Sequence, residues 1–259
     1  MRILAVLLLA LAGCASGPRI DTTYTSENQD GRVQFLVLHF TAETWESSVE
    51  TLTKDSRRPV SAHYLVRDDP PVIYRLVDEG RRAWHAGVSS WRRYTQLNSS
   101  SIGIEIVNLG DKGSPPDALV FRDYPPAQLD AVVALVKDIV KRHGIRPENI
   151  VGHAEIAPQR RVDPGPRFPW KRLADEGLVR WPDAGKVAER RAGFERELPD
   201  MEWFQERLYR HGYEVPRNGE LDEPTRRVIA SFQMRYRPDR YDGFPDAETA
   251  AILDVLVEP

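Results

Sequence analysis

Cysteine is almost missing from this sequence of 259 residues, because Cys14 is the only one. A single cysteine excludes any disulfide within the chain, so the fold is not a disulfide-stapled scaffold. The net charge is only -3, and no run of lysine and arginine is interleaved with aromatic residues, which argues against nucleic acid as a partner. With 41% hydrophobic and 29% charged residues, the chain suits a water-soluble globular protein with one medium and one small domain.

The one long apolar run lies at the N-terminus, in "MRILAVLLLALAGCAS". It follows a basic residue, covers residues 3–12 and is too short to span a bilayer, as in a secretory signal. "LAGC" resembles a bacterial lipobox, in which the cysteine is acylated and becomes the new N-terminus; a lone thiol could instead be a buried or a catalytic cysteine. We expect residues 1–14 to be a lipoprotein signal ending in lipidated Cys14. The protein would then be lipid-anchored in the bacterial cell envelope, and Ser16 favours the periplasmic face of the outer membrane.

Strand and helix patterns alternate over residues 32–181, after a polar tether over residues 15–31. "VQFLVLHF", "SAHYLVRDDPPVIYRLV" and "SSIGIEIVNLG" predict strands, and "ENIVGH" predicts a short strand that ends in a histidine. "PPAQLDAVVALVKDIVKRHGI" predicts a helix, because its apolar residues share one face, prolines open it and Gly144 follows it. We therefore expect an α/β domain with a mixed central β-sheet flanked by helices.

The C-terminal part contains an internal repeat. Strand patterns stop and charge rises near residue 182, which predicts a linker over residues 182–198. In residues 199–259, "GELDEPT" and "GFPDAET" share the pattern G-x-x-D-x-x-T, and each opens an amphipathic helix whose aspartate is a natural N-cap. Together with "MEWFQERLYRHG" they predict a small three-helix domain.

Two histidines stand at the ends of predicted strands. His39 ends the first strand, His153 ends the last, and Asp163 follows in "GHAEIAPQRRVDPGPRFPW". Two imidazoles and one carboxylate suit a catalytic zinc site, because they leave the fourth position open for water. The spacing is not the compact HExxH pattern, and the residues alone leave open one core histidine and one solvated turn. Glu105 in "GIEIVN" is equally open, since a strand glutamate can face solvent.

Five motifs in one order add to this interpretation: "LVLHFTA", "SAHYLV", "RRAWHAGVSSW", "SIGIEIVN" and "VGHAEIAPQRRVDPGPRFPW". Over about residues 33–181 the chain resembles the zinc-dependent N-acetylmuramoyl-L-alanine amidases of type 2, which are related in fold to phage T7 lysozyme and the peptidoglycan recognition proteins. The resemblance implies a Zn²⁺ ion held by His39, His153 and Asp163, with Glu105 as the catalytic proton carrier.

The implied reaction is hydrolysis of the amide bond between N-acetylmuramic acid and L-alanine in peptidoglycan or its fragments. Two alternatives stay open: a non-catalytic peptidoglycan receptor that uses the same groove, and a zinc hydrolase that acts on another bond of the stem peptide. The receptor is disfavoured because such relatives typically lose a zinc ligand, whereas this sequence keeps all three matching residues and the glutamate.

One matching position departs from the family pattern. Many members carry lysine two residues before the ligand aspartate, where this chain has Arg161. We expect Arg161 to stabilise the developing oxyanion without donating a proton. The resemblance also places His85 and Trp84 beside the substrate groove, although a loop-fixing histidine and a core tryptophan explain them as well. His63 and Tyr64 are expected to line or support the zinc pocket.

The C-terminal repeat resembles the three-helix peptidoglycan-binding domain of cell-wall hydrolases, with a purely structural helical appendage as the alternative. A wall-binding domain would raise the concentration of substrate at the catalytic groove without adding contacts there. We expect peptidoglycan as the partner, membrane contact through the lipid anchor, and a monomer.

Overall fold

The computed structural model describes residues 17–18, 20–114 and 119–258. The chain up to Asp30 and the chain from Gly31 onward form two separate units. In the first unit the described residues form no helix or strand, and Cys14 with the rest of the predicted signal lies outside the described residues. Among the helices that the structure describes, none combines the length and the apolar character needed to cross a bilayer.

A five-stranded mixed sheet forms the centre of the second unit, as the sequence predicts, in the order β3-β2-β6-β1-β7. Strands β2, β6, β1 and β7 run parallel, and β3 is antiparallel to β2. A separate two-stranded hairpin is formed by β4 and β5. The strand bounds are β1 Phe35–Phe40, β2 Tyr64–Val66, β3 Ile73–Arg75, β4 Ser90–Trp91, β5 Tyr94–Thr95, β6 Ser101–Ile106 and β7 Ile150–Gly152.

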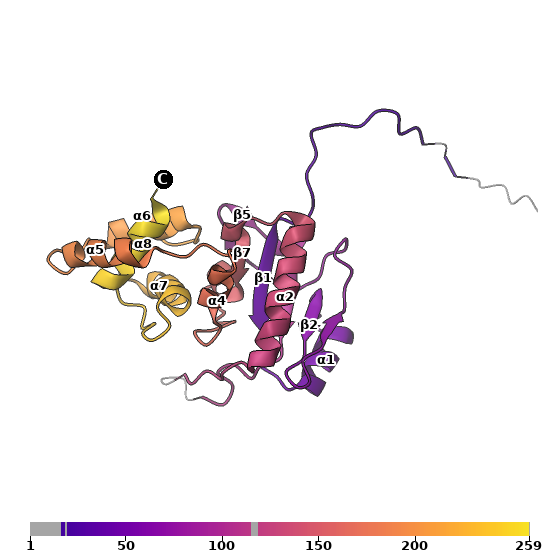
Figure 1. Cartoon of the computed structure of the whole chain (residues 1–259), viewed down its shortest axis with the longest axis horizontal. Coiled ribbons are helices and arrows are strands. Elements are labelled where there is room, and N and C mark those ends of the chain that lie inside the picture. Colours follow the sequence, from indigo (N-terminus) through magenta and orange to yellow (C-terminus); the bar gives the residue numbers. More distant parts are fainter. Residues whose placement is uncertain (1–16, 19, 115–118, 259) are drawn as a thin grey trace, which may run out of the picture. The chain divides into compact units, whose positions relative to one another are not determined.

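Both faces of β1 are buried, which explains why its sequence is an almost continuous apolar run. Leu36 and Leu38 belong to the cluster that includes the apolar face of helix α2 (Pro126–His143), which lies alongside the sheet (Figure 1). Phe35 and Val37 belong to a second cluster, shared with the C-terminal helices. Alternation along the strand puts His39 on the same face as Phe35 and Val37, opposite α2.

Helix α2 begins and ends where the sequence predicts. Pro126 is its first residue, where a missing N–H costs nothing, and Gly144 after its last residue adopts a left-handed conformation with φ 63°. The other helices in the catalytic region are shorter: α1 Trp45–Thr53, α3 His153–Ile156, α4 Trp170–Asp175, and the 3-10 turns Leu97–Ser99 and Pro147–Asn149.

The C-terminal region contains α6 (Met201–His211), α7 (Glu223–Tyr236) and α8 (Ala247–Val257), the three predicted helices. The two repeat aspartates cap α7 and α8 as expected: Asp222 and Asp246 each accept a backbone N–H at 2.8 Å. The segment interpreted as a linker contains a further helix, α5 (Ala184–Phe194), which packs along α8 and gathers with the other C-terminal helices (Figure 1). The domain limits themselves stay a prediction.

The four parallel strands have their carboxyl ends at the same end of the sheet, and the candidate site lies at this end. His39 lies directly opposite Glu105 in the register of β1 and β6. His153 follows the last residue of β7 as the first residue of α3. Polar side chains at the carboxyl ends of adjacent parallel strands face a common crevice, as in other α/β sheets.

Candidate active site

The three side chains predicted as metal ligands meet at this end of the sheet. Nδ1 of His39 lies 3.0 Å from Nδ1 of His153, and Oδ2 of Asp163 lies 3.1 Å from each of these nitrogens. All three residues are buried. The ligand atoms of a tetrahedral zinc with bonds of about 2.0–2.1 Å lie about 3.3 Å apart, so this triangle has the size of a zinc site.

Hydrogen bonds fix the protonation of His39 so that its inner nitrogen is free. Its outer nitrogen, Nε2, lies 3.0 Å from Nδ1 of His85. On the far side of that ring, Nε2 of His85 lies 3.1 Å from the hydroxyl of Ser101, which donates to the carbonyl of Leu97 at 2.6 Å. Because the carbonyl of Leu97 can only accept, Ser101 donates to it and accepts from Nε2 of His85, and Nδ1 of His85 then accepts from Nε2 of His39. Nδ1 of His39 therefore carries no proton and keeps its lone pair for a metal.

His153 is oriented in the same way by a backbone carbonyl. Its Nε2 lies 3.2 Å from the carbonyl oxygen of Ala86, so this nitrogen carries the proton and Nδ1 faces Asp163 with a lone pair. The His39 and His153 rings meet edge to face, with centroids 4.5 Å apart. Two neutral imidazoles with inward lone pairs and one carboxylate are a suitable donor set for Zn²⁺.

The electrostatics keep these groups in the forms that bind a metal. Burial lowers the pKa of His39 to about 4, with a further lowering by His153, so its imidazole is neutral near pH 7. Burial alone would raise the pKa of Asp163, but His153 and His39 lower it well below its ordinary value. Asp163 is therefore a carboxylate in the cluster.

Glu105 lies beside the cluster without belonging to it. Its Oε1 is 4.0 Å from Nδ1 of His39, and among the described residues its buried Oε2 has no hydrogen-bond partner. Burial raises the pKa of Glu105 well above its ordinary value, Asp163 raises it further, and Arg161 lowers it. A buried carboxyl with an unpartnered oxygen beside the His39–His153–Asp163 group has the placement of a proton carrier.

A cavity of about 180 Å³ opens onto these residues. Its lining includes Glu105, His153 and Asp163, together with the exposed Arg161 and the half-exposed Trp84. The cavity therefore brings together most of the residues that the sequence singled out.

Three residues that the sequence analysis assigns to the zinc pocket or the substrate groove, His85, His63 and Tyr64, use their polar atoms in contacts within the protein. His85 lines the cavity, but both of its ring nitrogens are engaged, by His39 and by Ser101, so it orients His39 and offers no free ring nitrogen to a substrate. Neither His63 nor Tyr64 is among the lining residues. The roles predicted for these two residues at the zinc pocket and the substrate therefore stay predictions.

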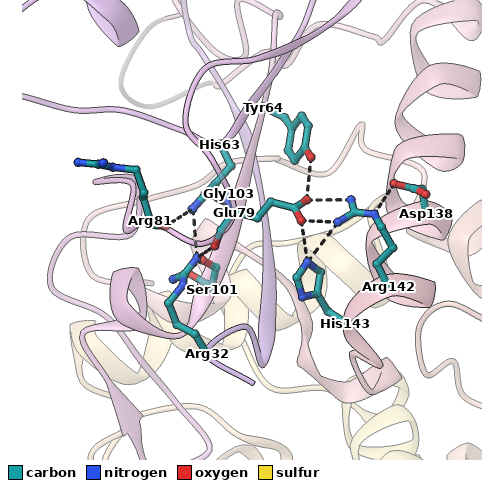
Figure 2. Close-up of polar contacts among 10 residues, drawn as sticks. All are labelled: Arg32, His63, Tyr64, Glu79, Arg81, Ser101, Gly103, Asp138, Arg142 and His143. Carbon is teal, nitrogen blue, oxygen red and sulfur yellow. Dashed lines mark hydrogen bonds and ion pairs between the residues drawn. The ribbon is translucent and has the colours of Figure 1, made fainter. Parts of the chain in front are cut away.

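His63 and Tyr64 belong to one polar network, which is joined through Arg32 and Glu79 (Figure 2). The buried His63 accepts the backbone N–H of Gly103 at 3.0 Å, and its Nε2 lies 3.1 Å from the carbonyl of Arg81. The hydroxyl of Tyr64 donates to Glu79 at 2.7 Å. Their polar atoms are thus used to hold strands and loops in place.

Sequence reasoning missed two further contributors to the site. Ser101 fixes His85, but a serine that opens a strand gives no signal of this role. Gly103 does give a signal in the sequence, because a glycine inside a strand often marks a close approach by another group. A Cβ at Gly103 would lie 2.4 Å from the His85 ring, so only glycine admits this ring.

A buried ion pair joins the C-terminal helices to the turn that carries His153. Glu155 in α3 accepts the N–H of Gly152 at 2.7 Å, and Arg235 in α7 contacts both carboxylate oxygens of Glu155 at 2.7 and 2.9 Å. The guanidinium also donates to the carbonyl of Ile150 at 3.1 Å and lies 4.1 Å from the centroid of the Trp170 ring. The helical region therefore braces β7 and α3 from behind.

Comparison with known proteins agrees with this geometry. A family model described as "N-acetylmuramoyl-L-alanine amidase" matches residues 29–166, which is more than half of the chain. The chain belongs to this family. A second model, described as "Putative peptidoglycan binding domain", matches residues 197–253 of this family member.

Two relatives illustrate the similarity. N-acetylmuramoyl-L-alanine amidase AmiD of Escherichia coli is 44% identical over 270 residues, covering 98% of this chain and 96% of the relative. 1,6-Anhydro-N-acetylmuramyl-L-alanine amidase AmpD of Citrobacter freundii is 40% identical over 114 residues, covering 44% of this chain and 55% of the relative.

Solved structures match over nearly the whole chain. AmiD from E. coli, in complex with anhydro-N-acetylmuramic acid-L-Ala-D-γ-Glu-L-Lys, has a TM-score of 0.83 at 43% identity and covers 93% of this chain and 95% of that chain. AmpDh3 from Pseudomonas aeruginosa, in complex with anhydromuramic pentapeptide, has a TM-score of 0.85 at 40% identity and covers 92% and 96%. The predicted family and the predicted fold class are both confirmed.

Proposed function

We propose that this protein is a zinc-dependent N-acetylmuramoyl-L-alanine amidase, which hydrolyses the amide bond between N-acetylmuramic acid and L-alanine in peptidoglycan or its fragments. The observation that carries the proposal is the triangle of His39, His153 and Asp163, with inward lone pairs. His153 and Asp163 line one cavity together with Glu105. Membership in the amidase family and the muropeptide ligands named for the AmiD and AmpDh3 structures support the substrate class.

Nδ1 of His39, Nδ1 of His153 and the carboxylate of Asp163 are the groups that would hold the zinc. A bound zinc ion makes water acidic enough to attack near neutral pH and polarises the scissile carbonyl. The chain's own contribution is to fix both imidazoles through His85 and the Ala86 carbonyl, so that the donor atoms converge before a metal arrives.

Glu105 is the proposed proton carrier. Its unpartnered Oε2 would accept a proton from the attacking water and then deliver that proton to the nitrogen of the leaving L-alanine. The raised pKa of this buried carboxyl suits both halves of the transfer, since a group of low pKa would not hold the proton long enough to donate it.

Arg161 is proposed to stabilise the negative charge that develops on the carbonyl oxygen. The residue is exposed and lines the cavity, so its guanidinium is accessible to a bound substrate. Because a guanidinium stays protonated, it contributes charge and hydrogen bonds and no proton. The exposed face of Trp84 offers an apolar wall for the sugar or the lactyl group.

The place of action proposed for the protein is the bacterial cell envelope, where peptidoglycan is found. The match of residues 197–253 to a peptidoglycan-binding model supports attachment to the wall. Acylation of Cys14 would add an anchor to the membrane, with the periplasmic face of the outer membrane as its proposed site and a monomer as the working unit. Wall and membrane attachment together would hold the cavity close to its substrate.

The experiment that tests the proposal is mass spectrometry of purified muropeptides after incubation with the protein. We expect release of peptides that begin with free L-alanine together with peptide-free sugar. Chelation should abolish the release, and Glu105→Gln should lower kcat by at least a hundredfold while the protein keeps its zinc.

Other outcomes would change the assignment. Muropeptides that bind and stay intact would replace the amidase with a peptidoglycan receptor. Cleavage at a different bond would keep the metal-dependent hydrolase and discard the substrate. Full activity of Glu105→Gln would remove this residue from the reaction.

A further inference from the structure

The hairpin formed by β4 and β5 turns through two arginines in an unfavourable conformation. Trp91 pairs with Tyr94, so Arg92 and Arg93 form a two-residue loop, and their φ angles are 47° and 73°. Two positive φ angles are typical of a type I′ turn, which favours Asn-Gly because other residues are strained there. A strained pair of identical charged residues is a reason to look for a binding role.

The hairpin is held firmly enough to present these side chains in a fixed place. Trp91 is buried, and its indole N–H donates to the carbonyl of Glu148 at 3.1 Å. Its ring packs edge to face on Tyr213, with centroids 5.1 Å apart, and the N–H of Arg92 donates to the carbonyl of Gly212 at 2.8 Å. The turn is therefore tied to the segment that follows α6.

A cavity of about 680 Å³ lies where the hairpin meets this segment. Its walls include the two arginines from one side and Tyr209, Arg210 and Glu214 from the other. It shares no lining residue with the cavity at the metal cluster. The volume falls in the range of cavities that take small ligands, about 300–1,000 Å³.

Positively charged side chains outnumber carboxylates among the residues that line this cavity. Within the part of the chain that the structure describes, neither Arg92 nor Arg93 has a carboxylate partner, whereas Arg210 lies 2.7 Å from Glu206. Glu214 is the one carboxylate among the lining residues, and it accepts a hydrogen bond from Ser90 at 3.2 Å. The cavity thus offers two free guanidiniums and one carboxylate, which suits a ligand that carries carboxylates and an ammonium.

We propose that this cavity is a second binding site, for the stem peptide of peptidoglycan, with peptide carboxylates on Arg92 and Arg93 and an ammonium on Glu214. The inference rests on the proposed function for the class of ligand. The peptide named in the AmiD complex has this chemistry, because a γ-linked glutamate keeps its α-carboxylate and a terminal lysine has both charges. A concave site of mixed charge fits a short zwitterionic peptide better than the flat surface of an anionic membrane.

The second binding site is lined by residues from both segments that match family models. The hairpin lies within residues 29–166 and the opposite wall lies within residues 197–253, so neither segment completes the cavity alone. Wall binding by this protein would therefore depend on a hairpin of the amidase region and not on the helical repeat by itself.

The test uses a turn replacement that separates binding from folding. Arg92→Asn with Arg93→Gly installs the residues that the turn prefers and removes both guanidiniums. We expect the melting temperature to stay the same or rise by a few degrees, while retention on purified sacculi falls at least tenfold. The tripeptide L-Ala-γ-D-Glu-L-Lys should bind the native chain at two sites per molecule and the variant at one, as measured by NMR titration.

The control removes two positive charges elsewhere. Lys112→Gln with Lys141→Gln takes away two exposed lysines, and we expect sacculus retention and peptide stoichiometry to match the native chain. Vesicles containing phosphatidylglycerol form a third arm, on which the turn variant should bind as the native chain does.

Three results would overturn the inference. These are unchanged stoichiometry and retention in the turn variant, an equal loss in the lysine control, and a loss confined to the vesicles, which would make the hairpin a membrane contact. None of these measurements requires cleavage of the substrate. The second site can therefore fail while the amidase assignment stands, and the amidase assignment can fail while peptide binding at the hairpin persists.

Discussion

At the scale of single residues, the decisive feature is which nitrogen of each histidine faces inward. His39 and His153 present Nδ1 to the cluster because their outer nitrogens are occupied by His85 and by a backbone carbonyl. The sequence marks His39 and His153 by their places at strand ends, and the family motifs mark these two histidines and Asp163 as the expected ligands. The sequence also singles out His85, but not its contact with His39, because His85 reaches that ring from a loop whose course no local pattern specifies.

Replacing His85 tests this arrangement. His85→Leu removes the acceptor for the N–H of His39 while keeping a side chain of similar size, and we expect zinc affinity to fall about 10–100-fold. His85→Asn keeps an oxygen near the position of the lost nitrogen and should bind zinc more tightly than the leucine variant. Competition with a chromophoric chelator measures both affinities. Native zinc affinity in His85→Leu would show that the orientation of His39 has another cause.

At the scale of elements, Glu79 ties the loop after β3 to strand β2 and to the end of α2 (Figure 2). Its carboxylate accepts from Tyr64 at 2.7 Å and from Arg142 at 2.8 Å, and Nε2 of His143 lies 2.7 Å from it. Burial alone would raise the pKa of Glu79, but hydrogen bonds from Arg142, His143 and Tyr64 lower it to about 2. Burial and the neighbouring Glu79 carboxylate raise the pKa of Tyr64 to about 12, although Arg142 acts in the opposite direction.

This network predicts a loss of stability in acid. Because the pKa of Glu79 is lower in the folded chain than its ordinary 4.5, its carboxylate stabilises the fold above about pH 4.5, and the contribution disappears as the pH falls towards 2. Glu79→Gln should cost about 1–2 kcal/mol at pH 7, allowing for solvent screening, and much less at pH 3. Melting temperatures of both proteins between pH 7 and pH 3 measure the difference. If the melting temperatures of the two proteins differed by the same amount at every pH, the prediction would be wrong.

The elements that the sequence predicted are those with a long or capped pattern. Helix α2 has an apolar face and defined ends, and the repeat aspartates mark α7 and α8. The sequence does not predict helix α5, because none of its residues is buried and it has no apolar stripe to detect. The four-residue α3 and the two-residue strands of the hairpin are too short to show any period, and tertiary contacts decide their conformation.

At the scale of the whole molecule, the amidase region and the C-terminal helices share one core within residues 31–259. The second face of β1 packs in a cluster that includes Phe204, Phe232 and Leu253 from α6, α7 and α8. A three-helix domain carried on a linker would leave that face uncovered. The sequence could not show this sharing, since the apolar residues of β1 and of the helices fit separate cores equally well.

The buried pair of Arg235 and Glu155 crosses this shared core, and breaking it should affect both regions. Arg235→Met leaves a carboxylate without its partner behind His153, so we expect a loss of about 3–5 kcal/mol in unfolding free energy and faster zinc release. Adding Glu155→Leu removes the stranded charge and should restore most of the stability.

Arg237→Met is the matched control, because Arg237 pairs with Asp246 inside the helical region and leaves α3 untouched. It should lower stability without changing zinc release. Calorimetry should show one cooperative transition for the native chain, since neither region keeps a complete core alone. Two separate transitions, or native zinc retention in Arg235→Met, would mean that the helices are an attachment to the metal site and not a part of its support.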